Sequence, residues 1–71
     1  MSCEIRSSMP GKIIQVIKNV GEKVLESEEI LVMEAMKMEM PVVSPVAGII
    51  TEIKVAEGKS VAKDELLATV G

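Results

Sequence analysis

The sequence predicts a single all-β domain over residues 1–71, folded as a barrel or sandwich with two similar halves. Runs rich in Val, Ile and Thr alternate with turns that contain Pro or Gly, which is typical of short, half-buried strands. The chain also repeats itself, because a shift of 37 positions aligns its halves without a gap. With 71 residues, 48% of them hydrophobic, it has enough apolar surface for one small core.

The internal repeat places glycines, serines and apolar residues at matching positions of the two halves. The identical pairs are Ser7/Ser44, Gly11/Gly48, Ile13/Ile50, Gly21/Gly58, Val24/Val61 and Glu28/Glu65. The conservative pairs are Ile5/Val42, Val16/Ile53, Ile30/Leu67 and Met33/Val70. Two pairs of glycines inside a regular apolar frame are hard to obtain by chance in so short a chain. We therefore expect the same elements in the same order in each half.

Each half is predicted to contain about four short strands joined by tight turns. The signals of the first half are a turn at Met9–Gly11, a strand at Ile13–Ile17, a turn at Gly21, a short strand at Val24 and a last strand at Ile30–Met33. The second half repeats them at Ser44–Gly48, Ile49–Val55, Gly58, Val61 and Leu66–Val70. Ile13 and Val16 lie three positions apart instead of two, which a β-bulge would explain.

One segment, EILVMEAMKMEM at residues 29–40, has the composition of a helix. Its methionines at positions 33, 36 and 40 also follow a helical spacing. The repeat argues against a helix, because Ile30–Met33 corresponds to the strand that closes the second half. We therefore predict a strand at 30–34, a hairpin tip at 35–38 and a returning strand at 39–43.

The composition excludes several classes of function. The chain has no His, Phe, Tyr or Trp, so it lacks a His-based catalytic triad, a His-ligated metal site and aromatic platforms for bases. Its net charge of −3 argues against nucleic acid as a partner. A single cysteine, Cys3, forms no internal disulfide and favours a cytoplasmic location. No apolar run is long enough for a membrane span, and residues 1–10 do not resemble a signal peptide.

The segment that joins the halves, residues 35–41, contains one basic residue, Lys37. A lysine at the tip of a two-stranded hairpin is exposed and sterically free, which suits a point of attachment that an activating enzyme can reach. Met36 and Met38 flank this lysine, where packing in the core cannot be their purpose. They are expected to present a soft apolar surface to a partner.

Glu34-Ala35-Met36-Lys37-Met38 reads EAMKM and resembles the attachment motif of biotinyl domains in the biotinyl/lipoyl carrier family. The resemblance extends from about Glu4 to Val70 and includes Met9–Gly11, the glycine turns, Ser44-Pro45 and the internal repeat. It implies a flattened barrel of two four-stranded antiparallel sheets with quasi-two-fold symmetry. It also implies a monomeric carrier domain with no catalytic residues and no metal of its own.

The resemblance further implies that Lys37 becomes biotinyl-lysine, with Glu34, Ala35, Met36 and Met38 as the surrounding motif. A biotin protein ligase would form biotinyl-adenylate, which the Lys37 amine would attack to make an amide. The biotin would then carry CO2 as carboxybiotin from a biotin carboxylase site to a carboxyltransferase site. The parent system would be a biotin-dependent carboxylase, decarboxylase or transcarboxylase.

The chain departs from the family pattern in two places. Ser27 and Asp64 stand in turns where the family often has glycine, and a left-handed backbone is less favourable for serine than for glycine. The ungapped repeat also leaves no room for the protruding thumb of some acetyl-CoA carboxylase carriers. The chain looks more like the carriers of other acyl-CoA, pyruvate or decarboxylating systems, either free-standing or as the C-terminal domain of a longer protein.

Three other interpretations compete with a biotin carrier. Lys37 could be lipoylated, although lipoyl domains generally have Asp-Lys-Ala at this tip and Met36 departs from that pattern. The segment at 29–40 could be a Met-rich amphipathic helix that binds in the groove of a partner. The Cys3 thiol could serve an enzyme, although no histidine is available to activate it.

Overall fold

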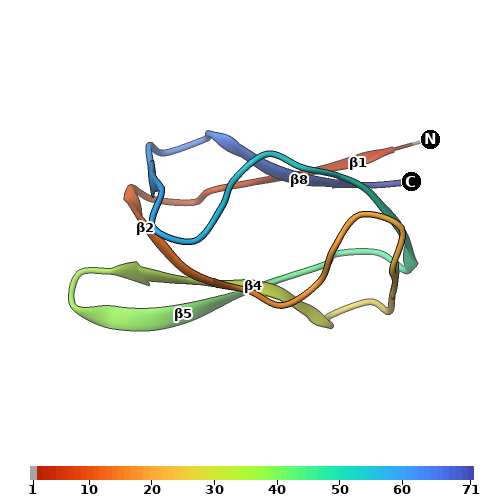
Figure 1. Ribbon diagram of the computed structural model, residues 1–71, viewed down its shortest axis with the longest axis horizontal. Coiled ribbons are helices and arrows are strands. Elements are labelled where there is room, and N and C mark those ends of the chain that lie inside the picture. Colours follow the sequence, from red (N-terminus) through yellow and green to blue (C-terminus); the bar gives the residue numbers. More distant parts are fainter. Residues whose placement is uncertain (1) are drawn as a thin grey trace.

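Strands make up all the regular secondary structure of the computed structural model, which describes residues 2–71 (Figure 1). They are β1 (Cys3–Arg6), β2 (Gly11–Val16), β3 (Lys23–Val24), β4 (Glu29–Ala35), β5 (Met38–Val43), β6 (Gly48–Ile53), β7 (Ser60–Val61) and β8 (Leu66–Val70). No helix occurs in this range, so none could span a membrane.

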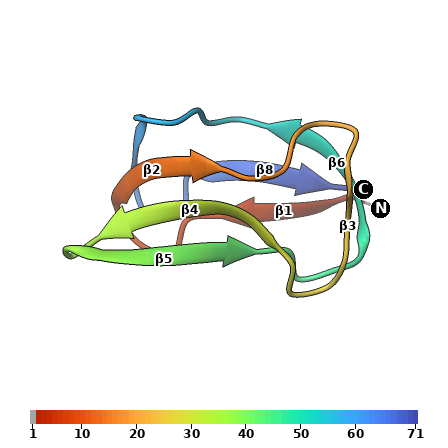
Figure 2. The ribbon, with the colours of Figure 1, turned by 60° about the horizontal axis from the view of Figure 1, so that its bottom comes forward.

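The strands form two four-stranded antiparallel sheets, which lie one above the other (Figures 1 and 2). The strand order is β1-β8-β6-β3 in one sheet and β5-β4-β2-β7 in the other. Exchanging each strand for its counterpart in the other half converts the first order into the second. The predicted all-β fold with an internal quasi-two-fold repeat is therefore confirmed.

Hydrogen bonds between the halves follow the same symmetry. The Gly21 amide donates to the carbonyl oxygen of Ile50 at 2.8 Å, and the Gly58 amide donates to that of Ile13 at 2.7 Å. Both glycines have a positive φ, 95° and 92°, which favours glycine over residues with a Cβ. Each glycine turn thus fastens one half to a core strand of the other, so neither half forms a separate unit.

The core lies between the sheets and contains side chains from both halves. The large aliphatic side chains with no exposed surface are Ile13, Ile30, Leu31, Ile50 and Leu67. Burying an aliphatic side chain of this size contributes about 1.5–3 kcal/mol relative to leaving it exposed. Two buried hydroxyls are satisfied within the fold, because Ser7 donates to the carbonyl oxygen of Met9 and Ser44 to that of Val46.

The irregular apolar spacing of the two long inner strands has the predicted cause. The register of β2 against β4 shifts between Ile13 and Gln15, and the register of β6 against β8 shifts between Ile50 and Glu52. Each strand therefore contains a bulge at the same place in the repeat. Because each bulge adds one residue, the two apolar residues that flank it are three positions apart and still face the core.

The segment with helical composition forms β4 and β5, so the helical interpretation is wrong. Its buried residues, Ile30, Leu31, Met33 and Ala35, lie on a strand that has β2 on one side and β5 on the other. The two neighbouring strands satisfy its backbone groups and the core covers its inner face, which outweighs a modest helical propensity. The predicted hairpin tip at 35–38 was too long, because Ala35 and Met38 pair as strand residues.

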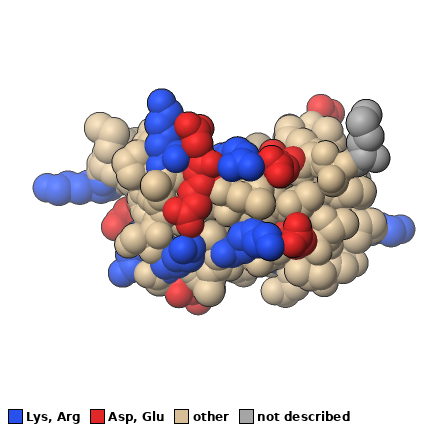
Figure 3. All heavy atoms as spheres, turned by 90° about the horizontal axis from the view of Figure 1, so that it is seen from above, with Lys and Arg blue, Asp and Glu red and all other residues tan. Residues whose placement is uncertain are grey.

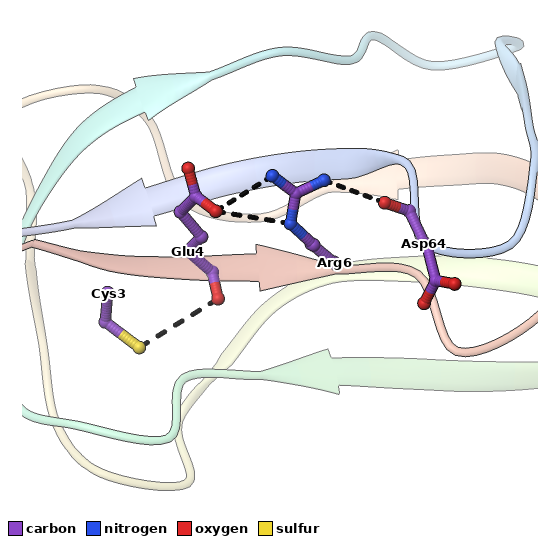
Figure 4. A network of polar contacts seen from close by, with 4 residues as sticks. All are labelled: Cys3, Glu4, Arg6 and Asp64. Carbon is purple, nitrogen blue, oxygen red and sulfur yellow. Dashed lines mark hydrogen bonds and ion pairs between the residues drawn. The ribbon is translucent and has the colours of Figure 1, made fainter.

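On the face shown in Figure 3, charged side chains of both signs lie next to one another rather than gathering by sign. The ion pairs of the described residues are Arg6–Glu4, Lys18–Glu28, Lys54–Glu52 and Lys59–Glu65. Arg6 also donates to the carbonyl oxygen of Asp64 at 2.9 Å, which ties the edge strand β1 to the turn before β8 (Figure 4). Exposed ion pairs such as Arg6–Glu4 add little stability. The main effect of Arg6 is therefore its hydrogen bond to Asp64, which fixes the turn before β8.

Candidate functional site

The hairpin of β4 and β5 carries Lys37 at the end of the molecule opposite the two termini (Figure 1). The strands pair as far as Ala35 and Met38, which leaves Met36 and Lys37 as a two-residue turn. The core beneath the hairpin holds β4 in place, whereas Lys37 itself is exposed. The structure thus places the predicted lysine at the outermost point of a supported hairpin.

The backbone of the turn is unusual for its residues. Met36 and Lys37 have positive φ values of 53° and 65°, as a type I′ turn requires of both central residues. Such turns favour Asn and Gly, and a left-handed residue with a Cβ costs roughly 1–2 kcal/mol. The Met-Lys sequence is therefore poor for stability at this position, a pattern more common at functional sites than elsewhere.

The methionines beside Lys37 are among the most exposed large apolar residues of the described chain. Met36 is 84% exposed and Met38 is 65% exposed, whereas Met33 on β4 is only 1% exposed. The prediction that Met36 and Met38 do not pack in the core is confirmed. Together with the stem of Lys37 they give the tip an apolar surface with one amine.

Two carboxylates lie side by side below the tip, one from the predicted motif and one that the sequence did not indicate. Glu34 of the predicted motif pairs directly with Glu39 across the hairpin, and both are exposed. Neither takes part in an ion pair with another described residue. Lys12 on β2 is the neighbour of Glu34 on its other side. The pairing follows from the two-residue turn, which a sequence without known register does not reveal.

Gly11 supports the base of the hairpin. A Cβ built on Gly11 would lie 2.6 Å from the carbonyl oxygen of Glu34 and 3.3 Å from the Cβ of Ala35. Only glycine lets β2 approach β4 this closely beside the motif. The sequence singled out Gly11 as a turn residue, and its repeat partner Gly48 shows the same close approach, with Gly71 and Val70 as the neighbours.

Other candidate groups lie away from Lys37 or carry no chemistry. Cys3 lies half-buried on β1, where the contact of its thiol is the carbonyl oxygen of Glu4 at 4.0 Å (Figure 4). A hollow of about 350 Å³ is lined by residues of β3 and β6 with Leu25 and Ala47, in the sheet that does not contain the hairpin. Across residues 2–71, no three His, Cys, Asp or Glu side chains are placed to hold a metal ion.

A small β-barrel that projects an exposed lysine at the tip of a hairpin has the form of a carrier domain, which presents a covalently attached group. The comparison with protein families agrees with this class. Residues 3–70 match the biotin/lipoyl family described as "Biotin-requiring enzyme". The chain belongs to this family, and the predicted family and its association with biotin are confirmed at that level.

A curated relative and two solved structures resemble the chain. The biotin carboxyl carrier protein of Streptococcus mutans is 40% identical over 87% of this chain, which spans about half (48%) of that protein. The urea carboxylase of Kluyveromyces lactis superposes with a TM-score of 0.95 and 25% identity, covering 100% of this chain and 6% of that one. Similar domains therefore lie within much longer carboxylase chains.

A lipoyl domain shares the fold as well. The lipoyl domain of the 2-oxoglutarate dehydrogenase complex from Azotobacter vinelandii superposes with a TM-score of 0.82. It is 30% identical and covers 96% of this chain and 94% of its own. The fold is therefore common to both kinds of carrier, and it does not by itself distinguish biotin from lipoate.

Proposed function

We propose that this chain, as a single domain over residues 1–71, is a biotin carboxyl carrier whose Lys37 is covalently biotinylated. The observation that carries the proposal is the exposed Lys37 on the two-residue turn of the β4–β5 hairpin, between Met36 and Met38. The relationship to the Streptococcus mutans biotin carboxyl carrier protein supports it. Glu34 and Ala35 complete the motif on β4.

The residues at the tip fit a covalently attached biotin. The Lys37 amine provides the nitrogen of the amide, and the long lysine stem extends the group away from the barrel. Met36 and Met38 offer apolar surface to the ligase and to the enzymes that the group visits. When attached, biotin supplies a ureido ring that accepts a carboxyl group at one site and releases it at another.

The barrel itself contributes position rather than bond-making. The two sheets and the close approach at Gly11 support the base of the hairpin, which should keep the ordering cost small at each visit to an active site. Tethering also replaces free diffusion by a high effective concentration of the attached group. These properties suit a carrier that moves between separate catalytic sites.

The partners follow from this function. We propose a biotin protein ligase, a biotin carboxylase and a carboxyltransferase, with no nucleic acid and no membrane insertion. We also propose that the domain is monomeric, as the family resemblance implies, and that it is cytoplasmic, since its one cysteine forms no internal disulfide. Light scattering of the purified domain tests the first property, and fractionation of the source cells tests the second.

The intact mass of the chain tests the proposal directly. Incubation with a biotin protein ligase, ATP and biotin should add one biotinyl group to the wild-type chain and none to Lys37→Arg. Lys12→Arg is the matched control, because Lys12 is also an exposed lysine near the hairpin and should leave the modification unchanged. Biotinylated Lys37→Arg protein would refute the site.

Lipoylation of Lys37 is the second candidate, because a lipoyl domain shares the fold at a TM-score of 0.82. Met36 stands where lipoyl domains generally have Asp, so we expect lipoate ligase to modify the chain far more slowly than biotin protein ligase. Parallel incubations with the two ligases decide the question. Faster addition of a lipoyl group would reverse the assignment while keeping Lys37 as the site.

A further inference from the structure

The five methionines in the described part of the chain differ sharply in exposure. Met36 is 84% exposed and Met38 is 65% exposed, and they enclose Lys37. Met33 is 1% exposed in the core, and Met9 and Met40 are partly buried against it. The tip therefore displays two thioethers to solvent, while the other three are shielded by the fold.

The two exposed thioethers have no structural role that would explain them. Met36 is the first central residue of the left-handed turn, where Asn or Gly would be more stable. Met38 lies opposite Ala35 at the end of the strand pair and leaves most of its side chain in water. These thioethers are therefore available to contact any molecule that binds at Lys37.

We propose that Met36 and Met38 form a redox modification site that controls the attachment of biotin to Lys37. The inference rests on the proposed function of Lys37. The oxidant is a peroxide: the thioether sulfur attacks one peroxide oxygen, an S–O bond forms and the O–O bond breaks. The sulfur loses two electrons, and the departing oxygen takes up a proton and leaves as water or an alcohol. Thiol-dependent reduction of the sulfoxide restores the methionine.

Oxidation changes the surface that a ligase must contact and leaves the fold unchanged. A sulfoxide is polar and chiral, so the apolar flanks of Lys37 become strong hydrogen-bond acceptors. A partner that covers these flanks with apolar groups must then desolvate the new oxygen without a compensating hydrogen bond. Because both side chains lie outside the core, the barrel loses no packing.

The first measurement is the order of oxidation in the unmodified chain. We expect dilute hydrogen peroxide to oxidise Met36 and Met38 at least about tenfold faster than Met33, whose sulfur is reached only through opening of the fold. Peptide mapping by mass spectrometry reads each site separately. Oxidation of Met33 at the same rate as Met36 would overturn the proposed site.

The second measurement couples oxidation to biotinylation. We expect kcat/KM of the biotin protein ligase to fall on the order of tenfold for the chain oxidised at Met36 and Met38, from the cost of covering an unpaired polar group. Reduction by methionine sulfoxide reductases for both epimers should restore the rate. An unchanged rate with both residues oxidised would overturn the control of attachment.

A double variant, Met36→Leu with Met38→Leu, separates the thioether from its apolar shape. It should fold with the thermal stability of the wild type within small limits, and its biotinylation rate should no longer respond to peroxide. A response equal to that of the wild type would place the sensitive group elsewhere and refute the proposal. If the wild-type chain gained no biotin from the ligase even without peroxide, the role of Lys37 would be refuted. The order of methionine oxidation could still be measured in that case.

Discussion

Ser27 and Asp64, which lie 37 positions apart, adopt the same left-handed backbone, with φ values of 68° and 67°. The Ser27 amide donates to the carbonyl oxygen of Ser44, and the Asp64 amide donates to that of Ser7, each at 2.7 Å. Each turn thus joins the start of one half to the end of the other. The two hydrogen bonds explain why a left-handed residue persists here in the absence of glycine.

The first prediction concerns this turn. Ser27→Gly should stabilise the domain by about 0.5–1 kcal/mol, because glycine removes the left-handed strain and this gain exceeds the extra entropy of the unfolded chain. The comparison variant is Ser60→Gly on β7, where φ is not positive and the substitution should destabilise. Urea unfolding of the three proteins gives both values, and a loss of stability in Ser27→Gly would contradict the account.

The second prediction concerns Gly48, whose restriction is steric rather than conformational. A Cβ at this position would lie 2.8 Å from both the carbonyl oxygen of Gly71 and Cγ1 of Val70. Gly48→Val should therefore destabilise the barrel by roughly 1–3 kcal/mol through overpacking. Gly48 does not need glycine for its backbone conformation, because positive φ among the glycines occurs at Gly21 and Gly58.

Asparagine distinguishes the two kinds of glycine. Gly21→Asn should cost less than Gly48→Asn, because asparagine tolerates a positive φ and a Cβ at Gly21 meets no atom within 4 Å. Thermal unfolding of the two variants provides the comparison. Equal losses would mean that the close approach of Gly48 to the last residues of the chain has no energetic weight.

The third prediction is a dependence of stability on pH. The Leu25 amide, and then Lys18, lower the pKa of Glu28 below its ordinary value of 4.5. The Ala62 amide, and then Lys59, lower the pKa of Glu65 in the same way. The charged carboxylates therefore favour the folded state. This contribution is complete above about pH 4.5 and is lost as the pH falls through the lowered pKa values of the folded state.

Denaturant unfolding between neutral pH and pH 3 measures this effect. The decline in stability should be smaller in Glu28→Gln, which keeps a hydrogen-bond acceptor but cannot be protonated. Glu26→Gln is the control, since Glu26 is exposed and takes no part in the ion pairs of the described residues. If Glu28→Gln and Glu26→Gln declined equally with acid, the assignment to Glu28 would fail.

The fourth prediction concerns the turn that holds the attachment residue. Lys37→Gly should stabilise the domain by about 0.5–1 kcal/mol, because glycine suits the positive φ of 65°. Lys37→Arg should leave stability unchanged, because arginine bears the same strain. Both variants should lose the modification, so stability and function separate at one position. Unfolding curves and intact masses of the two proteins test this, and equal stability would argue against strain in the turn.

The sequence predicted much of this architecture because the repeat supplies information that propensity lacks. The matched positions of Gly21 and Gly58 located the turns, and Ile13 with Val16 indicated the bulge. In residues 29–40 propensity and periodicity favoured a helix, and the comparison with Leu66–Val70 corrected that. The ends of the hairpin were misjudged by one residue on each side, because the pairing of Ala35 with Met38 depends on register.

The sequence by itself determined the fold class, the two related halves and the lysine of the motif, because these depend on the order of apolar, turn and motif residues along one chain. Only the tertiary structure decided the register of β4 against β5, the adjacency of Glu34 and Glu39 and the close approach at Gly11. These features arise where strands distant in sequence meet, and steric contact between their backbones fixes them. The residues of one segment alone do not predict such contacts between distant strands.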